Sequence, residues 1–563
     1  MPAYTSQLLP ASPSPAGSLL SLSALHAYSF HMQESSRLSL LALEQLPKSP
    51  AAPGELCELL LALLLRVQSQ SPNYNWDYRG SFHAVAEGNP ADVYPSSEAV
   101  KEALAKVPPV EASLETPLSS LLRGLIKAAE LLHLPTPNED KHADYLLSAA
   151  AFTELLPNDP SNPDLCFIVI SSLLLLHPWK LFAYPSGESL HPALTSQIVS
   201  LFETCTPTPH LGLNHLLVHF WELASSPSSA LAACRVLDSS SGNLPHLLHM
   251  PSHITLQLGD YAHVVASNLR AVAADKLHLE RLPESTPGDG FYTGYIAHDY
   301  HMAMYGACLG GYKQVALDVS LEQSTFLLPV QLFLDSPALR VGQETHLGLR
   351  LSVFMRFGMW AEILAATEGE VDAELKVYAC ARLLARAVAL ANTGRCEEGR
   401  GALAAAGPLL EEVKTMVRFM HNNSAHAVLS VELRRSEAEL FFFEGRAAEA
   451  FAKFEEAVEA DDGLAYDEPW GVLIPTRHSY AALLCDAGGA ENLATAMRLY
   501  REDLRVHPKN AWSIAGSLHV LELEPGLGKE GEEEELQGAM EELGKSEYAD
   551  VKIKSSCACS RAS

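Results

Sequence analysis

Apolar and polar residues along this chain recur with the period of an α-helix. From about residue 22 onward, leucine- and alanine-rich stretches alternate with short segments rich in glycine, proline or small polar residues. Residues 258–275 and 443–461 each contain a glycine turn followed by an alanine-rich helical pattern. In the second stretch, Gly445 marks the turn, and three residues are expected to pack inside: Ala450, Phe454 and Ala457. The pattern predicts an all-α fold of paired helices.

The turns recur at intervals typical of a helical repeat. Ser225 and Gly259 lie 34 residues apart, and Gly358 and Gly394 lie 36 residues apart. Thirty-four residues is the period of the tetratricopeptide (TPR) repeat. Longer intervals between Gly259 and Gly358 indicate insertions, and residues 281–290, with two prolines, are predicted to form a loop. We therefore predict a TPR-like helical solenoid, a superhelix of antiparallel helix pairs.

The pattern divides the chain into five segments. We predict a disordered Ser/Pro-rich tail at 1–21, N-terminal helical repeats at 22–200, TPR-like repeats with a histidine cluster at 201–340, C-terminal TPR-like repeats at 341–524, and an acidic segment with a tail at 525–563.

The net charge and the lengths of the apolar runs argue against nucleic-acid and membrane partners. The chain of 563 residues is 48% hydrophobic and has a formal net charge of −29. Such a field repels nucleic acids and anionic membrane surfaces and suits cations, basic peptides or neutral substrates. The longest apolar runs, residues 57–65 and 166–176, are too short to span a bilayer. We predict no nucleic-acid partner and no membrane span, and the oligomeric state stays open.

The ten cysteines show no spacing typical of a disulfide framework or a C-x-x-C motif, so we expect reduced thiols in a cytoplasmic protein. The first twenty residues lack the basic start of a secretory signal, and organelle targeting stays open. The Cys557-x-Cys559 pair suits either a soft metal or a plain tail, and we favour the tail.

Histidines with useful spacing concentrate between residues 214 and 302. The segments are N-H-L-L-V-H-F-W-E at 214–222, H-L-L-H-M-P-S-H at 246–253 and H-D-Y-H at 298–301. In the second segment, His249 and His253 follow His215 and His219 by 34 residues each. A pair of histidines four residues apart therefore recurs at the same place in two successive repeats.

Helical geometry puts several of these side chains on common faces. At about 100° per residue, a helix over 214–223 places His215, His219 and Glu222 on one side. Imidazoles with a carboxylate suit Zn, Fe, Mn or Cu(II). Pro251 suits a first helical turn, so we expect a helix to begin near Met250, after His249.

In a TPR solenoid the first helices of successive repeats line the concave groove, so the three segments are expected to share one space. A single buried histidine is more often a packing residue, but three groups in adjacent repeats, two of them in phase, favour a divalent transition metal (Cu, Zn, Fe or Mn). The predicted ligands are His215, His219, His249, His253, His298 and His301. Residues predicted to orient them are His246, Asp299 and Tyr300. The number of ions stays open.

Several elements resemble a little-characterised family of microbial TPR proteins. The specific ones are H-x-x-x-H-x-x-E at 215–222 and H-M-P-S-H at 249–253. Weaker similarities are spread over nearly the whole chain, for example at 71–75. Near the start, the family's early histidine falls on Met32, with His31 shifted by one residue. The resemblance implies a TPR-like solenoid and no particular reaction.

Two functions of different classes follow. The first is a metal-dependent enzyme with a small-molecule or peptide ligand in the concave groove. In it the metal activates water or dioxygen, and Glu222, or a histidine that does not bind the metal, acts as the catalytic general base. The alternative is a TPR scaffold for protein partners, with histidines that only pack. Metal storage or delivery is a third function. The sequence has no phosphate-binding glycine loop and no G-x-S-x-G motif.

Overall fold

We describe the protein from a computed structural model. The structure describes residues 141–560, except 159, 161, 206–209, 282–289 and 336, together with the isolated residues 124, 127, 128 and 131. The predicted tail at 1–21, the family-like segment at 71–75 and most of the predicted loop at 281–290 lie outside these residues. The chain forms two compact units, residues 1–254 and 255–563, and each is described by itself.

The described part of the first unit is mainly helical, apart from its loops, one of which (175–191) contains an isolated β-bridge between Phe182 and Ser189. Its helices are α7 (Lys141–Thr153), α8 (Pro163–Leu174), α9 (Pro192–Cys205), α10 (Leu211–Trp221), α11 (Leu231–Ser240), α12 (Pro245–His249) and the first residues of α13 (Pro251–Gln257), with short 3₁₀ turns η2 (Leu156–Asn158) and η3 (Pro227–Ala230). Helix α10 packs against both α8 and α11.

The buried side chain of His210 fixes the start of α10. Its Nδ1 accepts a hydrogen bond from the backbone N–H of Leu213, 3.0 Å away. Its Nε2 lies 2.9 Å from the carboxylate of Asp164, which is fully buried in α8. One imidazole therefore caps α10 and ties it to the neighbouring helix.

The second unit consists of helical hairpins. Its elements are α14 (Tyr261–Arg281), α15 (Gly290–Gly310), α16 (Lys313–Glu322), the π-helical turn η4 (Gln323–Leu327), α17 (Val330–Asp335), α18 (Pro337–Gln343), the 3₁₀ turn η5 (Glu344–Gly348), α19 (Leu349–Arg356), α20 (Trp360–Ala366), α21 (Lys376–Asn392), α22 (Cys396–Lys414), β1 (Phe419–Met420), β2 (Asn423–Ser424), α23 (Ala425–Phe443), α24 (Ala447–Asp462), α25 (Thr476–Ala487), α26 (Ala490–Val506), α27 (Ala511–Leu523), η6 (Pro525–Leu527) and α28 (Glu532–Gly544).

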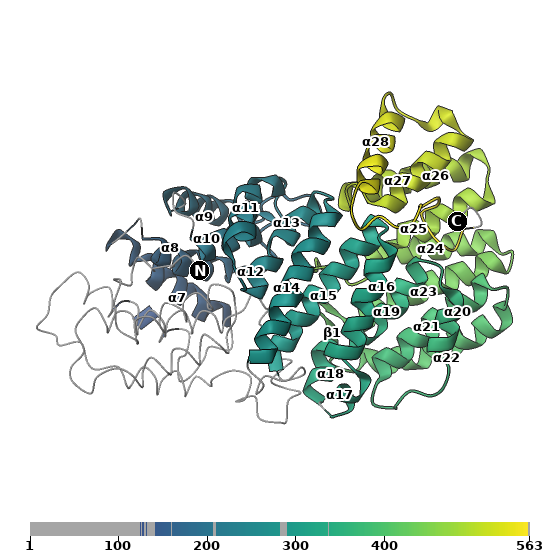
Figure 1. Cartoon of the computed structure of the whole chain (residues 1–563), viewed down its shortest axis with the longest axis horizontal. Helices are drawn as coiled ribbons and strands as arrows, with labels where there is room; N and C mark the ends of the chain where they lie inside the picture. The colour runs from purple at the N-terminus through teal and green to yellow at the C-terminus, as the bar shows by residue number, and fades with distance from the viewer. Residues whose placement is uncertain are drawn as a thin grey trace, which may run out of the picture. The chain divides into compact units, whose positions relative to one another are not determined.

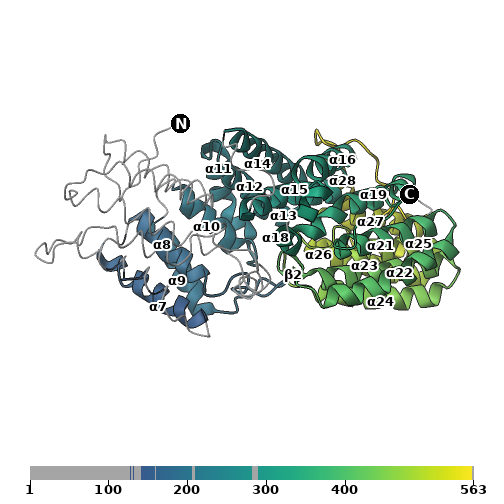
Figure 2. The ribbon, with the colours of Figure 1, turned by 90° about the horizontal axis from the view of Figure 1, so that it is seen from below.

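Successive helices of this unit pack as pairs, as the periodicity predicts. The pairs α21–α22 and α23–α24 lie side by side (Figures 1 and 2). Glycines with positive φ make the turns, Gly394 (78°) in the first pair and Gly445 (82°) in the second. In α24, Ala450, Phe454 and Ala457 are completely buried, as predicted. Paired antiparallel helices confirm the predicted all-α fold class, and within the described residues β1 and β2 form only a short hairpin.

The turn at Gly259 shows why a side chain is excluded there. Its φ is +74°, and an added Cβ would lie 2.2 Å from the carbonyl oxygen of Pro508. The hydroxyl of Tyr261 donates to the same oxygen at 2.7 Å. This contact joins segments about 250 residues apart, so the sequence motif L-G-D-Y also serves long-range packing.

The expectation of reduced thiols is wrong for four cysteines. Disulfide bonds join Cys166 to Cys205 and Cys557 to Cys559. The first links α8 to the end of α9, a pairing across 39 residues that spacing along the chain does not reveal. Among the described residues, no helix is both long and apolar enough to cross a membrane.

Candidate metal centre

Helix α10 carries the first two histidines of the predicted site. His215 is fully buried, and the side chain of His219, one turn later, is 10% exposed. Glu222 follows the helix as its C-terminal cap and is also buried. The predicted helix over 214–223 is thus confirmed to within two residues at its end.

The second segment folds into two short helices rather than one. Pro251 begins α13, as its lack of an N–H favours. His249 precedes this helix and His253 lies on it, which confirms the expected helix start near Met250; His249 is the last residue of the preceding helix α12. His246, His249 and His253 are all buried in the first unit.

Three imidazoles of the first unit converge on one point. One ring nitrogen from each of His215, His219 and His246 lies within 4.8 Å of the other two. The Nε2 atoms of His215 and His246 are 3.3 Å apart. Two nitrogens bound to one tetrahedral zinc at about 2.0–2.1 Å would be separated by about 3.3 Å. The donor set and its spacing therefore fit a transition-metal ion.

The carboxylate of Glu222 lies between two further ring nitrogens. Oε1 is 3.2 Å from Nδ1 of His219, and Oε2 is 2.7 Å from Nδ1 of His253. Burial raises the pKa of Glu222, but the neighbouring imidazoles of His253 and His219 and their hydrogen bonds outweigh it and hold this pKa below its ordinary value. A carboxylate only accepts, so Nδ1 of His219 is the protonated nitrogen and Nε2 is the nitrogen with the lone pair.

A second hydrogen bond extends from Glu222 toward His249. The Nε2 atoms of His249 and His253 are 2.7 Å apart. Burial lowers the pKa of His253 more than Glu222 raises it, so this ring is neutral near pH 7. Because Nδ1 of His253 donates to Glu222, its Nε2 accepts from Nε2–H of His249. Two groups of side chains result. His215, His219 and His246 form a triad, and a chain of hydrogen bonds runs from His249 through His253 to Glu222.

The remaining predicted ligands belong to the second compact unit. His301 is fully buried near the middle of α15. It lies beside His346 of η5 and His421 of the β1–β2 turn, and one nitrogen from each of the three lies within 4.8 Å of the others. The ring of His298 is 5.5 Å from that of His421. That the predicted ligands all share one space stays a prediction.

His346 and His421 were missed because no spacing pattern marks them. They follow His301 by 45 and 120 residues, neither of which fits the repeat. A weak signal was available at His421-Asn422-Asn423, since Asn and His are enriched in turns with positive φ.

Two residues predicted to orient ligands interact with other acids. Asp299 hydrogen-bonds Asp275, and burial together with this neighbouring carboxyl raises the pKa of Asp299 well above its usual range. Burial, followed by the nearby Glu322, raises the pKa of Tyr300. Their predicted orienting role stays a prediction.

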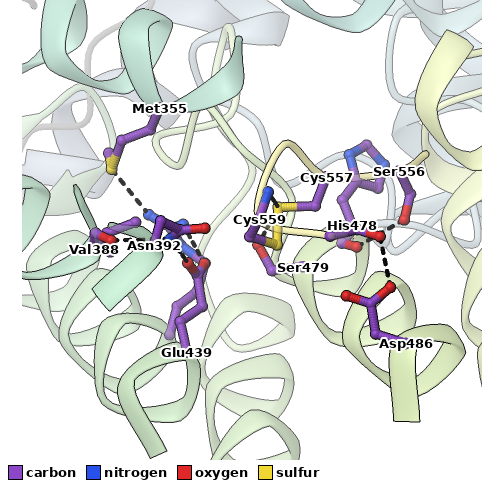
Figure 3. The surroundings of a disulfide bond; sticks show 12 residues. Met355, Val388, Asn392, Glu439, His478, Ser479, Asp486, Ser556, Cys557 and Cys559 are labelled. Atoms are coloured by element: carbon purple, nitrogen blue, oxygen red, sulfur yellow. Dashed lines mark hydrogen bonds and ion pairs between the residues drawn. A yellow bond between two sulfur atoms is a disulfide. The ribbon is translucent and has the colours of Figure 1, made fainter. Parts of the chain in front are cut away.

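The cysteine pair near the end of the chain is not a plain tail. Cys557 and Cys559 are 6% and 3% exposed, which contradicts the favoured expectation. Ser479 Oγ lies 3.5 Å from Cys557 Sγ, and Ser556 donates its hydroxyl to the carbonyl of His478 at 2.9 Å (Figure 3). With both sulfurs in a disulfide, neither is a thiolate ligand for a soft metal.

The chain has only distant structural similarity to known proteins. No family model matches the sequence, and no curated protein matches it significantly. Two solved structures of the human IFIT1 dimer, one with m7Gppp-AAAA and one with PPP-AAAA, are similar at 12% identity. They cover 95% of this chain and 91% and 96% of theirs, with TM-scores of 0.30 and 0.27. What the chain binds must therefore be inferred from its own residues.

Proposed function

We propose that the protein binds a divalent transition-metal ion in its first compact unit, through His215, His219 and His246. The convergence of one nitrogen from each ring carries this proposal. Three imidazole ligands leave a fourth position of a tetrahedral ion open for water or substrate, which is the ligand arrangement of catalytic zinc sites. Zn²⁺ fits this donor set, and copper is the competing ion.

In this proposal Glu222 orients the ligand His219 by accepting a hydrogen bond from it. A carboxylate that accepts from Nδ1 of a metal-binding imidazole fixes its tautomer and its orientation. Glu222 accepts from His219 in this way and from His253 on its other oxygen. A carboxylate with a depressed pKa is a weak proton acceptor, so the orienting role is better supported than the predicted role as general base.

A metal bound here would supply an activated water molecule or a polarised substrate oxygen. The pair His249–His253 continues the hydrogen bonds on the second oxygen of Glu222 and so helps to hold the carboxylate that orients His219. We propose on this basis a metal-dependent enzyme acting on a small molecule or peptide.

Metal content of the protein purified without a histidine tag tests the proposal. We expect a bound ion that His215→Ala and His246→Ala each remove from the first unit, whereas His519→Ala, at a partly exposed position in α27, leaves the content unchanged. Unaltered metal content in both site variants would contradict the proposal. A chain without metal would instead support the scaffold alternative.

A further inference from the structure

We propose that the second compact unit contains a metal site of its own, formed by His301, His346 and His421. This inference goes beyond the function proposed above, because all three side chains belong to residues 255–563 and the site does not use the histidines of α10 or α12.

The three rings form a nearly equilateral triangle. The centroid distances are 5.5 Å between His301 and His346, 5.7 Å between His301 and His421, and 5.6 Å between His346 and His421. The rings come from α15, η5 and the β1–β2 turn, so three separate elements present them to one point. One nitrogen of each ring lies within 4.8 Å of the other two, so the three side chains could bind one ion together.

Ring nitrogens in this triangle lack other partners. Both nitrogens of His301 and Nε2 of His421 make no hydrogen bond to any residue that the structure describes. A buried polar atom left in this state costs about 1–3 kcal/mol. His301 is completely buried, so bulk water does not compensate. A metal ion would use these lone pairs.

The electrostatic surroundings keep the rings neutral. Burial and then the neighbouring imidazoles lower the pKa of His301 well below its usual value. Burial and His421 lower the pKa of His346 to about 3, and burial lowers that of His421 to about 4. Among the described residues, no acidic group raises the pKa of any of the three. Neutral imidazole is the form that binds metals.

The β1–β2 turn holds His421 in a strained conformation. Its φ is +48°, the left-handed region that costs a non-glycine residue about 1 kcal/mol or more. The next two residues anchor the turn to one carboxyl group: Asn422 N–H donates to Asp467 Oδ1 at 3.0 Å, and Asn423 Nδ2 donates to Oδ2 at 2.9 Å. Strain that neighbouring residues maintain is typical of functional positions.

The segments that carry His346 and His421 are also bonded to each other. Thr345 donates its hydroxyl to the carbonyl of Phe419 at 3.1 Å. Arg418 Nε donates to the buried carboxylate of Glu344 at 3.0 Å. These two bonds join residues one to three positions before each histidine, so the two segments are held together before any ion binds.

The donor set defines the class of ion. Three neutral nitrogens and no carboxylate favour a borderline ion such as Zn²⁺ over Mg²⁺, Ca²⁺ or Mn²⁺. Co²⁺ adopts the same geometry as Zn²⁺ and gives visible absorption, so it serves as the probe.

The test is a Co²⁺ titration of full-length, tag-free, metal-depleted protein, followed by absorption. We expect two ions per wild-type chain, and one in His421→Gly, because glycine accepts the positive φ and preserves the turn while it removes the imidazole. His346→Ala should lose the same ion. The control is His426→Ala, a partly buried histidine five residues later in α23.

This experiment tests the two proposed metal sites independently of each other. Loss of one ion in His421→Gly but none in His215→Ala would support this inference and contradict the proposed function. Loss in His215→Ala but none in His421→Gly or His346→Ala would overturn this inference alone. Wild-type protein that binds no Co²⁺ would overturn both.

Discussion

His478 in α25 is as completely buried as His301 in α15, but the two imidazoles have different neighbours. His478 donates from Nε2 to Asp503 Oδ2 at 2.8 Å, and its Nδ1 accepts from Arg356 Nη1 at 2.8 Å. Both of its nitrogens are therefore used within the protein. Neither nitrogen of His301 makes a hydrogen bond to a described residue.

Asp503 is the centre of that first network. Besides His478, its carboxylate accepts from His507 Nδ1 at 2.9 Å, Asn510 Nδ2 at 2.9 Å and Ser513 Oγ at 2.6 Å. The other nitrogen of His507 lies 2.9 Å from the hydroxyl of Tyr305. A buried carboxylate thus turns histidines into structural donors, whereas the triad of His301, His346 and His421 keeps its lone pairs.

The histidines of the first unit combine both arrangements. Glu222 accepts from the Nδ1 atoms of His219 and His253, much as Asp503 accepts from Nε2 of His478 and Nδ1 of His507. The Nε2 atoms of His215 and His246 face each other as those of a ligand pair would. Burial alone therefore does not identify a metal ligand. A nearby carboxylate that accepts from a buried imidazole gives that imidazole a structural role.

The largest expected effect is at Asp503. Replacing it with Asn places an amide N–H₂ among four donors and leaves part of the network unpaired, so we expect a loss of about 3–5 kcal/mol in the free energy of unfolding. Urea denaturation measures it, with metal-free and metal-loaded protein losing equally. A loss below about 1 kcal/mol would mean that the network is not structural.

Low pH should remove most of the difference in stability between wild type and Asp503→Asn. Burial raises the pKa of Asp503, but the neighbouring His478 and His507 outweigh it and hold the pKa well below its ordinary value. A group with a depressed folded pKa stabilises above its unfolded pKa, about 3.9, and loses this contribution as pH falls toward the folded pKa. The stability gap between wild type and Asp503→Asn should be constant above about pH 5 and narrow below it, and a gap independent of pH down to unfolding would contradict the assignment.

Metal should stabilise the triad but not the network. Excess Zn²⁺ at about 100 times its dissociation constant should raise the free energy of unfolding by about 2.7 kcal/mol per site. His301→Ala should abolish the contribution of the second unit in thermal melts with and without a chelator. His507→Ala should retain the metal-dependent stabilisation, because His507 donates a hydrogen bond to Asp503 and is not a proposed ligand.

Glu222→Gln separates the two roles considered for this residue. If Glu222 orients His219, metal affinity in the first unit should fall by about 10–100-fold, as competition with a chelating dye would show. If it is only a general base, affinity should be unchanged while turnover is lost. Glu432→Gln, in α23 of the second unit, is the matched control.

The smallest expected effect is on metal-free protein with His421→Gly. Relief of the positive φ offsets the lost packing of the ring, so the free energy of unfolding should change by no more than about 1 kcal/mol in either direction. Thermal melts of metal-depleted protein would measure it. A larger loss would show that His421 is a packing residue first.

Local patterns in the sequence determined the helices and part of the site. Apolar periodicity specifies helix pairs because a helix needs only residues three or four apart to form its buried face. For the same reason, the placement of His215 and His219 on one face of α10 and the glycine turns at Gly394 and Gly445 followed directly from spacing.

Only the tertiary structure decided which side chains meet across separate elements. Spacing grouped His249 with His215, but in the structure His246 lies beside His215, and His249 lies beside His253. His346 and His421 join His301 through packing of η5, the β1–β2 turn and α15. The sequence carries no period for such contacts, because they depend on how helices pack and on which turns tertiary hydrogen bonds hold.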